Sequence, residues 1–345
     1  MKTLRFTIPV FIAVTLSYVL ISGGLAAGIP AASGNMVKLA PLTQAEMPSS
    51  GSVDNGSADG SILTNPVMAT PSEVLTFNDP YREKQWALSQ IQMQGLWPTA
   101  TGGAGILVAI LDTGIDQDHE DLEGKVVFEA NLTDSPAPGD VYGHGTHIAG
   151  IIAAYSNNGV GIVGVAPECQ LINIKVADDR GRCDASRIAR GIIWAVDKGA
   201  NVINVSIELG EPSPELEEAV NYAWGQGVVI IAAAGNEGTQ SPVYPAAYEH
   251  CIAVAATRQD NTLAPLSNYG DWVDAAAPGF NIYSTLPDDS YGYKSGTSFA
   301  TAYVSGLAAL LFGVVTDTND NGRLNDEVRA ALEESCQLTC INGMD

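Results

Sequence analysis

The sequence predicts an α/β fold in which a doubly wound, mostly parallel sheet carries helices on both faces. Apolar runs alternate with segments of helical pattern after residue 105, and the 36 Gly and 18 Pro residues suit many tight turns between them. Runs that are apolar throughout are typical of strands buried on both faces. The predicted strands occupy residues 106–111, 171–176, 201–207, 228–234 and 251–256.

A crossover helix is predicted between the third and fourth of these strands. Ser213 can cap this helix, Pro214 suits its first position, and Gly225 and Gly227 follow its last apolar residue. Apolar residues recur at helical spacing between these ends, at Leu216, Ala219, Val220, Ala223 and Trp224. Strands that alternate with helices form a parallel sheet, and sites in such sheets lie beyond the carboxyl ends of the strands.

The composition excludes several classes of protein. The chain has 345 residues with 39 acidic and 16 basic side chains, so its formal net charge is −23. Such a surface repels phosphates, which argues against a nucleic-acid binder or a protein of anionic membranes. With 46% hydrophobic and 16% charged residues, the chain can bury a sizeable core and lacks the composition of a disordered protein.

Residues 1–27 show the three zones of a secretory signal peptide. Two basic residues come first, an apolar run follows at 8–21, and small residues close the segment at 23–27. Pro9 and the short apolar run favour cleavage over a transmembrane anchor. We therefore expect an exported protein, extracellular or periplasmic, that makes no membrane contact once the signal is removed.

The segment at 28–76 is rich in Ser, Gly, Pro, Asn and Ala and has no hydrophobic period. It is expected to be a flexible leader or propeptide remnant before a folded domain at 77–345. Five cysteines allow at most two intramolecular disulfides. Cys336 and Cys340 are close enough in sequence to pair across a turn, whereas Cys169 and Cys251 lie beside apolar strands and suit core packing.

Asp112 directly follows the first predicted strand, in the motif LDTGID. The Gly114 turn lets this carboxylate stand at the edge of the sheet, where it could orient a base. Taken alone, an aspartate in such a motif is more often a turn or cap residue. The assignment of Asp112 therefore depends on the other motifs of the chain.

His144 lies in YGHGTHIAGIIAAY, where an apolar run predicts a helix starting beside it. Gly143 and Gly145 leave space around its imidazole. His147, three residues later, suggests a zinc site, but HGTH lacks the glutamate and the four-residue spacing of HExxH. Zinc is therefore not expected.

Ser298 precedes a helix rich in small apolar residues, in SGTSFATAYVSGLAALL. The amides at such a helix start favour developing negative charge, although a lone serine there is more often an N-cap. Asn236, in AAAGNEG, ends another strand and offers an amide donor of the kind an oxyanion hole uses, or else serves a turn. The order Asp, His, Asn, Ser excludes an α/β-hydrolase, because no histidine follows Ser298 and GTSFA is not a G-x-S-x-G elbow.

The motifs DTGID, GHGTHIAG, AAAGNEG and SGTSFAT resemble those of the subtilisin-like serine proteases, the peptidase S8 superfamily, and within it the thermitase type. The resemblance spans about 77–338 and implies a subtilisin-like fold and a monomeric, secreted serine endopeptidase, made as a zymogen, that acts on protein or peptide substrates. It implies that Ser298 is the nucleophile, His144 the general base and Asp112 its orienting acid, while Asn236 binds the oxyanion. The alternative is a catalytically silent binding or scaffold protein with the same fold.

Three residues near the serine depart from the usual pattern of these proteases. Ala302 and Tyr303 stand where the family usually has proline and then histidine. Because Ala is a better helix former than Pro, the helix is expected to survive with a small change at its entry. Phe299 replaces the frequent methionine and so removes a readily oxidised thioether.

The resemblance also implies a set of substrate-binding residues: Ser206, Glu208, Leu209, Gly235 and Val243. Glu208 and Leu209 stand where relatives have two glycines, and Val243 stands where glycine or asparagine is frequent. These changes predict a narrowed pocket for P1, the substrate residue whose carbonyl is attacked, so that small or medium residues are preferred to Phe or Tyr. A smaller, salt-sensitive increase in cleavage is expected for substrates with Lys or Arg at P1, unless the Glu208 side chain turns into solvent.

A structural calcium ion, Ca2+, is implied by the same resemblance. The matching positions are Asp79, Asp121 and Asn158, with carbonyl oxygens near Tyr155, Val160 and Ile162. Oxygen ligands from distant segments suit this hard cation, although both aspartates also fit turns.

The segment DTNDNGRLNDEV, from Asp317, resembles an EF-hand or dockerin loop. Its twelfth position is Val328, which lacks the bidentate carboxylate that closes such loops. We therefore interpret it as a connecting loop in which Asn325 caps the last helix.

Overall fold

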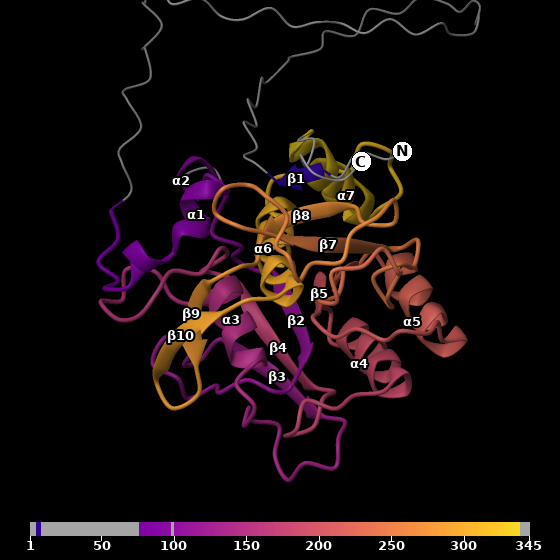
Figure 1. The fold of residues 1–345 in the computed structure, drawn as a ribbon, viewed down its shortest axis with the longest axis horizontal. Coiled ribbons are helices and arrows are strands. Elements are labelled where there is room, and N and C mark those ends of the chain that lie inside the picture. The colour runs from indigo at the N-terminus through magenta and orange to yellow at the C-terminus, as the bar shows by residue number, and fades with distance from the viewer. Residues whose placement is uncertain (1–4, 8–75, 98–99, 339–345) are drawn as a thin grey trace, which may run out of the picture. The chain divides into compact units, whose positions relative to one another are not determined.

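A nine-stranded sheet forms the centre of the computed structural model, which describes residues 5–7, 76–97 and 100–338 (Figure 1). Across the sheet the strands are β11 (Cys336–Leu338), β1 (Arg5–Thr7), β8 (Ala275–Pro278), β7 (Cys251–Thr257), β6 (Val229–Ala233), β5 (Val202–Val205), β2 (Leu107–Asp112), β4 (Gln170–Lys175) and β3 (Val126–Asn131). Every neighbouring pair is parallel except β1 with β11. The predicted parallel sheet is confirmed.

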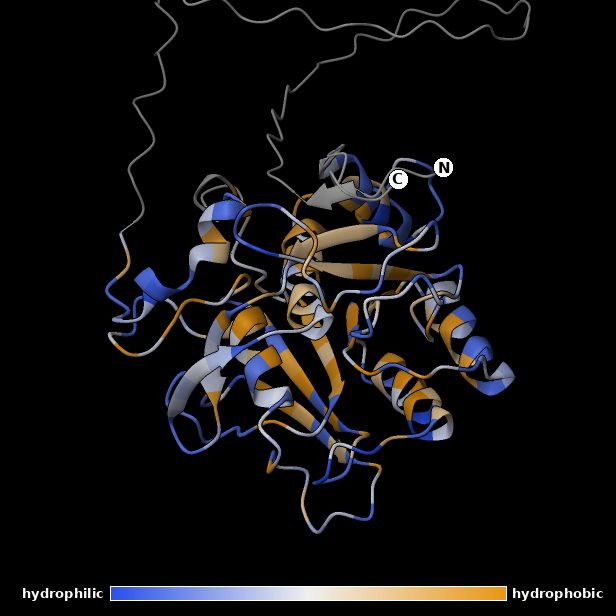
Figure 2. Cartoon of the chain, in the orientation of Figure 1, coloured by the Kyte–Doolittle hydropathy of each residue, from blue (hydrophilic) through white to orange (hydrophobic). Residues whose placement is uncertain are grey.

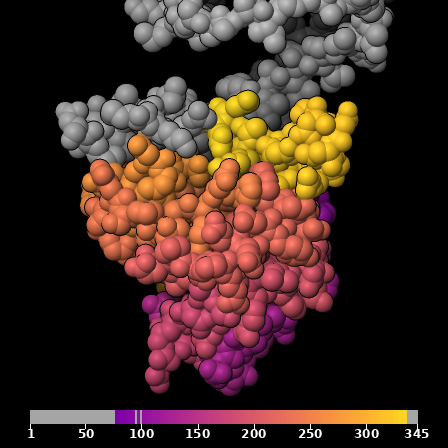
Figure 3. All heavy atoms as spheres, turned by 90° about the vertical axis from the view of Figure 1, so that its right-hand side faces the viewer, coloured from indigo at the N-terminus to yellow at the C-terminus, as the bar shows by residue number. Residues whose placement is uncertain are grey.

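Helices cover both faces of this sheet. On one side lie η1 (Arg82–Lys84), α1 (Trp86–Gln90), α2 (Met93–Leu96), α3 (Gly145–Ala153), α6 (Thr297–Phe312) and α7 (Asn325–Ser335), together with the hairpin of β9 (Ile282–Leu286) and β10 (Ser290–Lys294). On the other side lie α4 (Ala185–Asp197) and α5 (Pro214–Gly225), which face the viewer in Figure 3. The doubly wound arrangement is therefore present.

Alternate residues of the central strands enter two large apolar clusters. In β2, Val108 and Ile110 pack with residues of α3 and α6, whereas Ala109 and Leu111 pack with residues of α4 and α5. Figure 2 shows the strands as the apolar centre of the fold and the polar residues on the outer sides of the helices. Burial on both faces explains why these strands read as unbroken apolar runs.

The five predicted strands correspond to β2, β4, β5, β6 and β7, with ends that differ by at most two residues. Helix α5 begins at Pro214 as predicted, and the Ser213 side chain accepts the Leu216 N–H at 3.4 Å. Helix α6 runs without a break through Ala302 and Tyr303, both of which are buried.

The prediction for Asn325 is wrong in one respect. Helix α7 begins at Asn325 itself, and the Asn325 amide donates to the Trp224 carbonyl at 3.0 Å. The residue therefore ties α7 to the end of α5 and does not cap its own helix. The preceding loop is closed by Asp317, which accepts backbone N–H groups, and Val328 packs into the core.

Cys169, Cys183 and Cys251 are free thiols, and Cys169 and Cys251 are buried. A Cys336–Cys340 disulfide stays a prediction because Cys340 lies outside the described residues. The predicted signal and leader also lie outside them, apart from the strand β1 and residue 76. No helix in the described ranges has the length and apolarity needed to cross a membrane.

Close packing between α6 and the segment that joins α3 to β4 leads to a stability prediction. A Cβ on Gly306 would lie 2.6 Å from the Val165 Cβ, so Gly306→Ala should lower the free energy of unfolding by about 1–3 kcal/mol. Gly225→Ala is the control, because its Cβ would meet nothing within 4 Å at the last residue of α5. Urea unfolding measures both variants, and equal stability for the two would contradict the close contact.

Candidate active site

The carboxyl ends of neighbouring strands bring the candidate residues together. Asp112 is the last residue of β2, Ser206 directly follows β5, and Asn236 follows β6 by three residues. The starts of two helices meet the same edge, with His144 directly before α3 and Ser298 as the second residue of α6. All four candidate catalytic residues therefore lie at one end of the sheet.

Asp112 and His144 form a close pair. The two carboxylate oxygens of Asp112 lie 2.8 and 2.9 Å from Nδ1 of His144. The aspartate side chain is 1% exposed and that of the histidine 21%. Burial alone would lower the pKa of His144, but the charge and hydrogen bond of Asp112 outweigh it and raise that pKa above its ordinary value.

Asp140 holds the backbone around this pair. Its buried carboxylate accepts the Thr113 hydroxyl at 2.8 Å, the Gly143 N–H at 2.8 Å, and both the N–H and the hydroxyl of Thr146 at 2.9 and 2.7 Å. Thr113 follows Asp112 and Thr146 lies in the first turn of α3. One side chain thus fixes the end of β2 against the start of α3.

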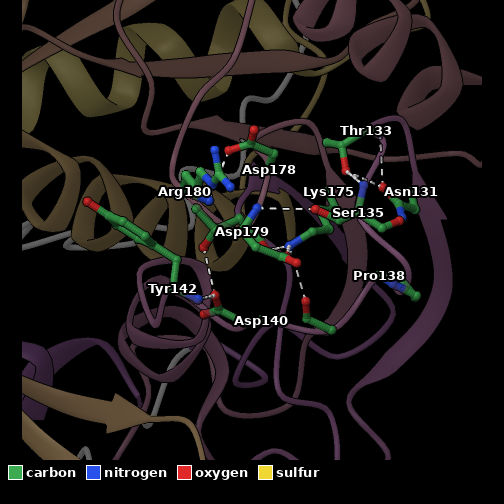
Figure 4. A network of polar contacts seen from close by, with 12 residues as sticks. Asn131, Thr133, Ser135, Pro138, Asp140, Tyr142, Lys175, Asp178, Asp179 and Arg180 are labelled. Atoms are coloured by element: carbon green, nitrogen blue, oxygen red, sulfur yellow. Dashed lines mark hydrogen bonds and ion pairs between the residues drawn. The ribbon is translucent and has the colours of Figure 1, made fainter.

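Lys175 reinforces the same region from the end of β4. Its fully buried ammonium donates to the carbonyls of Thr113 and Gly139 and pairs with Asp179 at 2.9 Å. Figure 4 shows Lys175 between the loop that carries Asp140 and the segment that carries Asp179. Neither Asp140 nor Lys175 was predicted from the sequence, although a lysine inside the apolar run LINIKV is a visible signal.

Ser298 is pinned at the start of α6. Its hydroxyl donates to the Ser206 carbonyl at 3.3 Å, and the Ser206 hydroxyl donates to the Ser298 carbonyl at 3.2 Å. The Phe299 ring centroid lies 5.5 Å from that of His144 and 4.6 Å from that of His147. The ring therefore packs the start of α6 against the start of α3.

His147 acts here as a neutral packing residue. It is buried, its Nε2 lies 3.2 Å from the Gly292 carbonyl, and burial lowers its pKa to about 3. A histidine that stays unprotonated can donate this hydrogen bond without placing a second positive charge beside His144.

The side-chain oxygen of Asn236 is held by hydrogen bonds to the start of α6. This oxygen, Oδ1, accepts the N–H of Thr297 at 2.9 Å and the Thr297 hydroxyl at 3.3 Å. The Gly235 N–H in turn donates to the Thr297 hydroxyl oxygen at 3.1 Å. These bonds fix the segment after β6 beside Ser298 and leave the exposed Asn236 Nδ2 as a donor.

The predicted substrate-binding residues differ in their surroundings. The backbones of Leu209 and Tyr244 pair across a bridge with two 2.9 Å hydrogen bonds, which join the segments that carry Glu208 and Val243. Val243 is 7% exposed and packs in the apolar cluster under α4 and α5. Its side chain therefore packs with the core, and the effect of Val243, Glu208 and Leu209 on the width of a P1 pocket stays a prediction.

The six candidate calcium residues also come together. Asp79 accepts the N–H groups of Asn157 and Asn158 at 2.9 and 3.3 Å. Asp121 accepts the Asn158 amide and the Ile162 N–H, both at 2.8 Å, while its own carbonyl accepts the N–H of Tyr155 at 3.1 Å. The N–H of Val160 donates to the Asn158 side-chain oxygen at 3.1 Å, which closes the loop.

The chemistry of this loop suits a hard cation. Both aspartates are buried, and burial raises the pKa of Asp121 against the hydrogen bonds from Ile162 and Asn158, which lower it. A Cβ at Gly161 would lie 1.9 Å from an Asp121 oxygen, so the loop must close on a glycine there. The described residues hold no group of three His, Cys, Asp or Glu placed to bind a metal, so amide and carbonyl oxygens would have to contribute to any calcium site here.

Comparisons with known proteins agree with these motifs. A sequence profile of the subtilase family matches residues 103–338. The chain is 44% identical over 262 residues to a thermophilic serine proteinase of Bacillus sp. (strain AK1), covering 75% of this chain and 64% of that protein, slightly less than two thirds of its length. It is also 44% identical over 262 residues to thermitase of Thermoactinomyces vulgaris, covering 75% and 91% of the two chains.

A solved structure shows the same fold. The structure described as proteases from Pseudoalteromonas arctica PAMC 21717 matches with a TM-score of 0.68 at 30% sequence identity, covering 74% of this chain and 91% of that one. Its similarity supports the α/β architecture that the sequence predicted.

The pairing of Asp112 with His144 yields a titration prediction. Asp112→Asn removes the charge that opposes the effect of burial, so the pKa of His144 should fall below its ordinary value of about 6.5. NMR titration of the imidazole measures the shift. Asp260→Asn, which changes an exposed aspartate bonded to Thr262, should leave the His144 titration unchanged. An unchanged pKa in Asp112→Asn would contradict the proposed balance of effects.

Proposed function

Since the chain belongs to the subtilase family and is a serine-type endopeptidase, we propose that it hydrolyses peptide bonds of protein substrates through a triad of Asp112, His144 and Ser298. The observation that carries the proposal is the contact of both Asp112 oxygens with Nδ1 of His144 at 2.8 and 2.9 Å. Ser298 stands at the adjacent helix start, where Phe299 packs on the same imidazole.

The first step forms an acyl-enzyme. The Ser298 Oγ attacks the scissile carbonyl carbon while its proton passes to Nε2 of His144. Asp112 accepts the hydrogen bond from Nδ1 and stabilises the imidazolium that forms. Because the Ser298 hydroxyl donates to the Ser206 carbonyl in this structure, it must rotate toward the imidazole before it reacts.

The oxyanion of the tetrahedral intermediate is bound by Nδ2 of Asn236 and the Ser298 N–H. When the intermediate collapses, the C–N bond breaks and His144 gives its proton to the leaving amine. His144 then takes a proton from a water molecule that attacks the acyl carbon, and the Ser298 oxygen leaves and regains a proton. The products are an amine, a carboxylic acid and the free enzyme.

The loop at 155–162 is proposed to hold Ca2+ with Asp79 and Asp121. The oxygens of the Asn158 side chain and of the backbone at Tyr155, Val160 and Ile162 would complete the set. The two buried carboxylates of Asp79 and Asp121, which accept hydrogen bonds from a loop closed by Gly161, support this assignment. An ion there would join segments that are distant in sequence and so stabilise the folded chain.

Export and maturation complete the proposal. Residues 1–27 are proposed to be removed as a signal peptide, and 28–76 to be a leader that precedes the peptidase domain at 77–345. The basic, apolar and small-residue zones of the first segment support this division. The proposed substrates are proteins and peptides, for which no nucleic acid or membrane partner is needed.

Replacement of the nucleophile tests the reaction directly. Ser298→Ala should abolish peptide hydrolysis and fluorophosphonate labelling while leaving the melting temperature close to that of the wild type, because the hydroxyl is small and lies at a helix start. Ser186→Ala, at an exposed serine of α4, is the matched control and should keep both activities. A folded wild-type protein that is not labelled by a fluorophosphonate would instead support the silent scaffold.

Removal of calcium tests the loop at 155–162. A chelator should lower the melting temperature, because an ion in thousandfold excess over its Kd that binds only the folded state adds about 4 kcal/mol. Asp121→Asn should reduce the difference between calcium and chelator, whereas Asp118→Asn, at an exposed position nearby, should keep it. Identical melting curves of the wild type with calcium and with chelator would exclude the site.

A further inference from the structure

Two glutamates converge beside the candidate active site. Glu208 lies two residues after Ser206, and Glu237 directly follows Asn236. A Cβ on Gly235 would lie 2.8 Å from Oε2 of Glu208 and 3.1 Å from Oε2 of Glu237, so both carboxyl groups pack on the same glycine. The positive φ of 98° at Gly235 keeps this position free of a side chain.

The start of α6 lies between the segments that carry these glutamates. Ser298 exchanges hydrogen bonds with Ser206 on one side, and Thr297 bonds to Gly235 and Asn236 on the other. A carbonyl attacked by Ser298 with its oxygen at Asn236 therefore lies between the two segments. The Glu208 and Glu237 carboxyl groups belong to the two segments that flank this carbonyl, which makes them candidates for contact with the substrate side chain next to it, P1.

The two carboxyl groups have unequal hydrogen bonding. Oε2 of Glu237 accepts the Asn236 N–H at 3.0 Å and the Asn268 amide at 2.9 Å. Oε2 of Glu208 is shielded from solvent and has no hydrogen-bond donor among the described residues. A proton on Glu208 supplies the missing bond, because a carboxylic acid can donate to the neighbouring Glu237 carboxylate.

The charge on this pair changes near neutral pH. Burial first, and then the hydrogen bond and charge of Glu237, raise the pKa of Glu208 to about 7. The residues that contact this pair or its neighbours in the bonds above include no Lys, Arg or His: they are Gly235, Asn236 and Asn268 from the β6 side, Tyr244 opposite Leu209, and Thr297 of α6. Below this pKa the pair holds one negative charge, and above it the pair holds two.

We propose, on the basis of the serine protease function proposed above, that Glu208 and Glu237 are specificity-determining residues that share a proton at the P1 subsite. When the shared proton is lost, the subsite prefers a basic P1 side chain. With the proton bound, the subsite accepts small and medium uncharged residues. The absence of a neighbouring cation in the contacts above leaves the substrate itself as the positive partner when both carboxylates are charged.

The structure refines the expectation from sequence for Glu208. Its buried Oε2 and its contact with Gly235 place the side chain against the β6 segment, not free in solvent. The increase in cleavage after Arg or Lys is therefore expected to depend on pH as well as on salt. Because Glu237 is exposed, solvent screens part of the attraction between the two carboxylates and a basic P1 side chain. We therefore expect the kcat/KM for a basic P1 residue, relative to that for an uncharged one, to change roughly three- to tenfold.

The test compares two peptides that differ only in P1 arginine or P1 citrulline, which has nearly the same shape without charge. The ratio of their kcat/KM values is measured from pH 5.5 to 9, so that titration of His144 affects both peptides and cancels. In the wild type the ratio should rise roughly three- to tenfold through about pH 7. A flat ratio in an enzyme that cleaves both peptides and reacts with a fluorophosphonate overturns this inference alone.

Three variants test whether the pH dependence of this ratio comes from Glu208 and Glu237. Glu208→Gln should flatten the ratio, and Glu237→Gln should move the rise to lower pH, because it removes the charge that holds the proton on Glu208. Glu211→Gln, at an exposed glutamate three residues from Glu208, should keep the wild-type rise. A rise that persists in Glu208→Gln overturns the inference, and failure of the wild type to cleave either peptide or to be labelled overturns the proposed function with it.

Discussion

The burial of the parallel sheet on both faces is the constraint on which the rest of this structure depends. Strands such as β2 and β6 are apolar throughout because helices cover both of their sides. In the central strands the charged side chains of Asp112 and Lys175 stand at strand ends, and the buried amides of Asn173 and Asn204 within the strands are hydrogen-bonded. Asp112 and Asn236 lie at or just after strand ends, and the helices that cover one face bring His144 and Ser298 to the same edge.

The edge of a sheet alone does not fix a catalytic geometry. Short hydrogen bonds from side chains hold the candidate catalytic residues in position. Asp140 joins Thr113 to Thr146, so the carboxylate and imidazole are held by backbone that cannot shift independently. Thr297 performs the same task between α6 and Asn236. Donors and acceptors that are oriented before the substrate arrives need not reorganise during the reaction, which is how preorganised sites lower a barrier.

Much of this arrangement could be predicted from the sequence. The five buried strands and α5 follow from local hydrophobic patterns, and the four catalytic candidates follow from motifs that stand at strand ends. Strands such as β3, with several exposed positions, have no such pattern. The roles of Asp140, Lys175 and Glu237 depend on contacts between segments distant in sequence, so no local pattern predicts them. The burial of Val243 depends on how a loop packs, which a local pattern does not show either.

The loop between β3 and α3 is fastened at both of its ends and open at its tip. Asn131 accepts two bonds from Thr133 at one end, and Asp140 anchors the other, whereas residues 134, 136 and 137 are exposed. An insertion at the exposed positions 136 and 137 would leave these anchors in place, whereas residues 134 and 135 are hydrogen-bonded to Arg187 and Asp179. In evolution this tip is a place where insertions can accumulate and acquire new surface chemistry, and an engineer could graft an epitope there without re-tuning the residues that carry out the reaction.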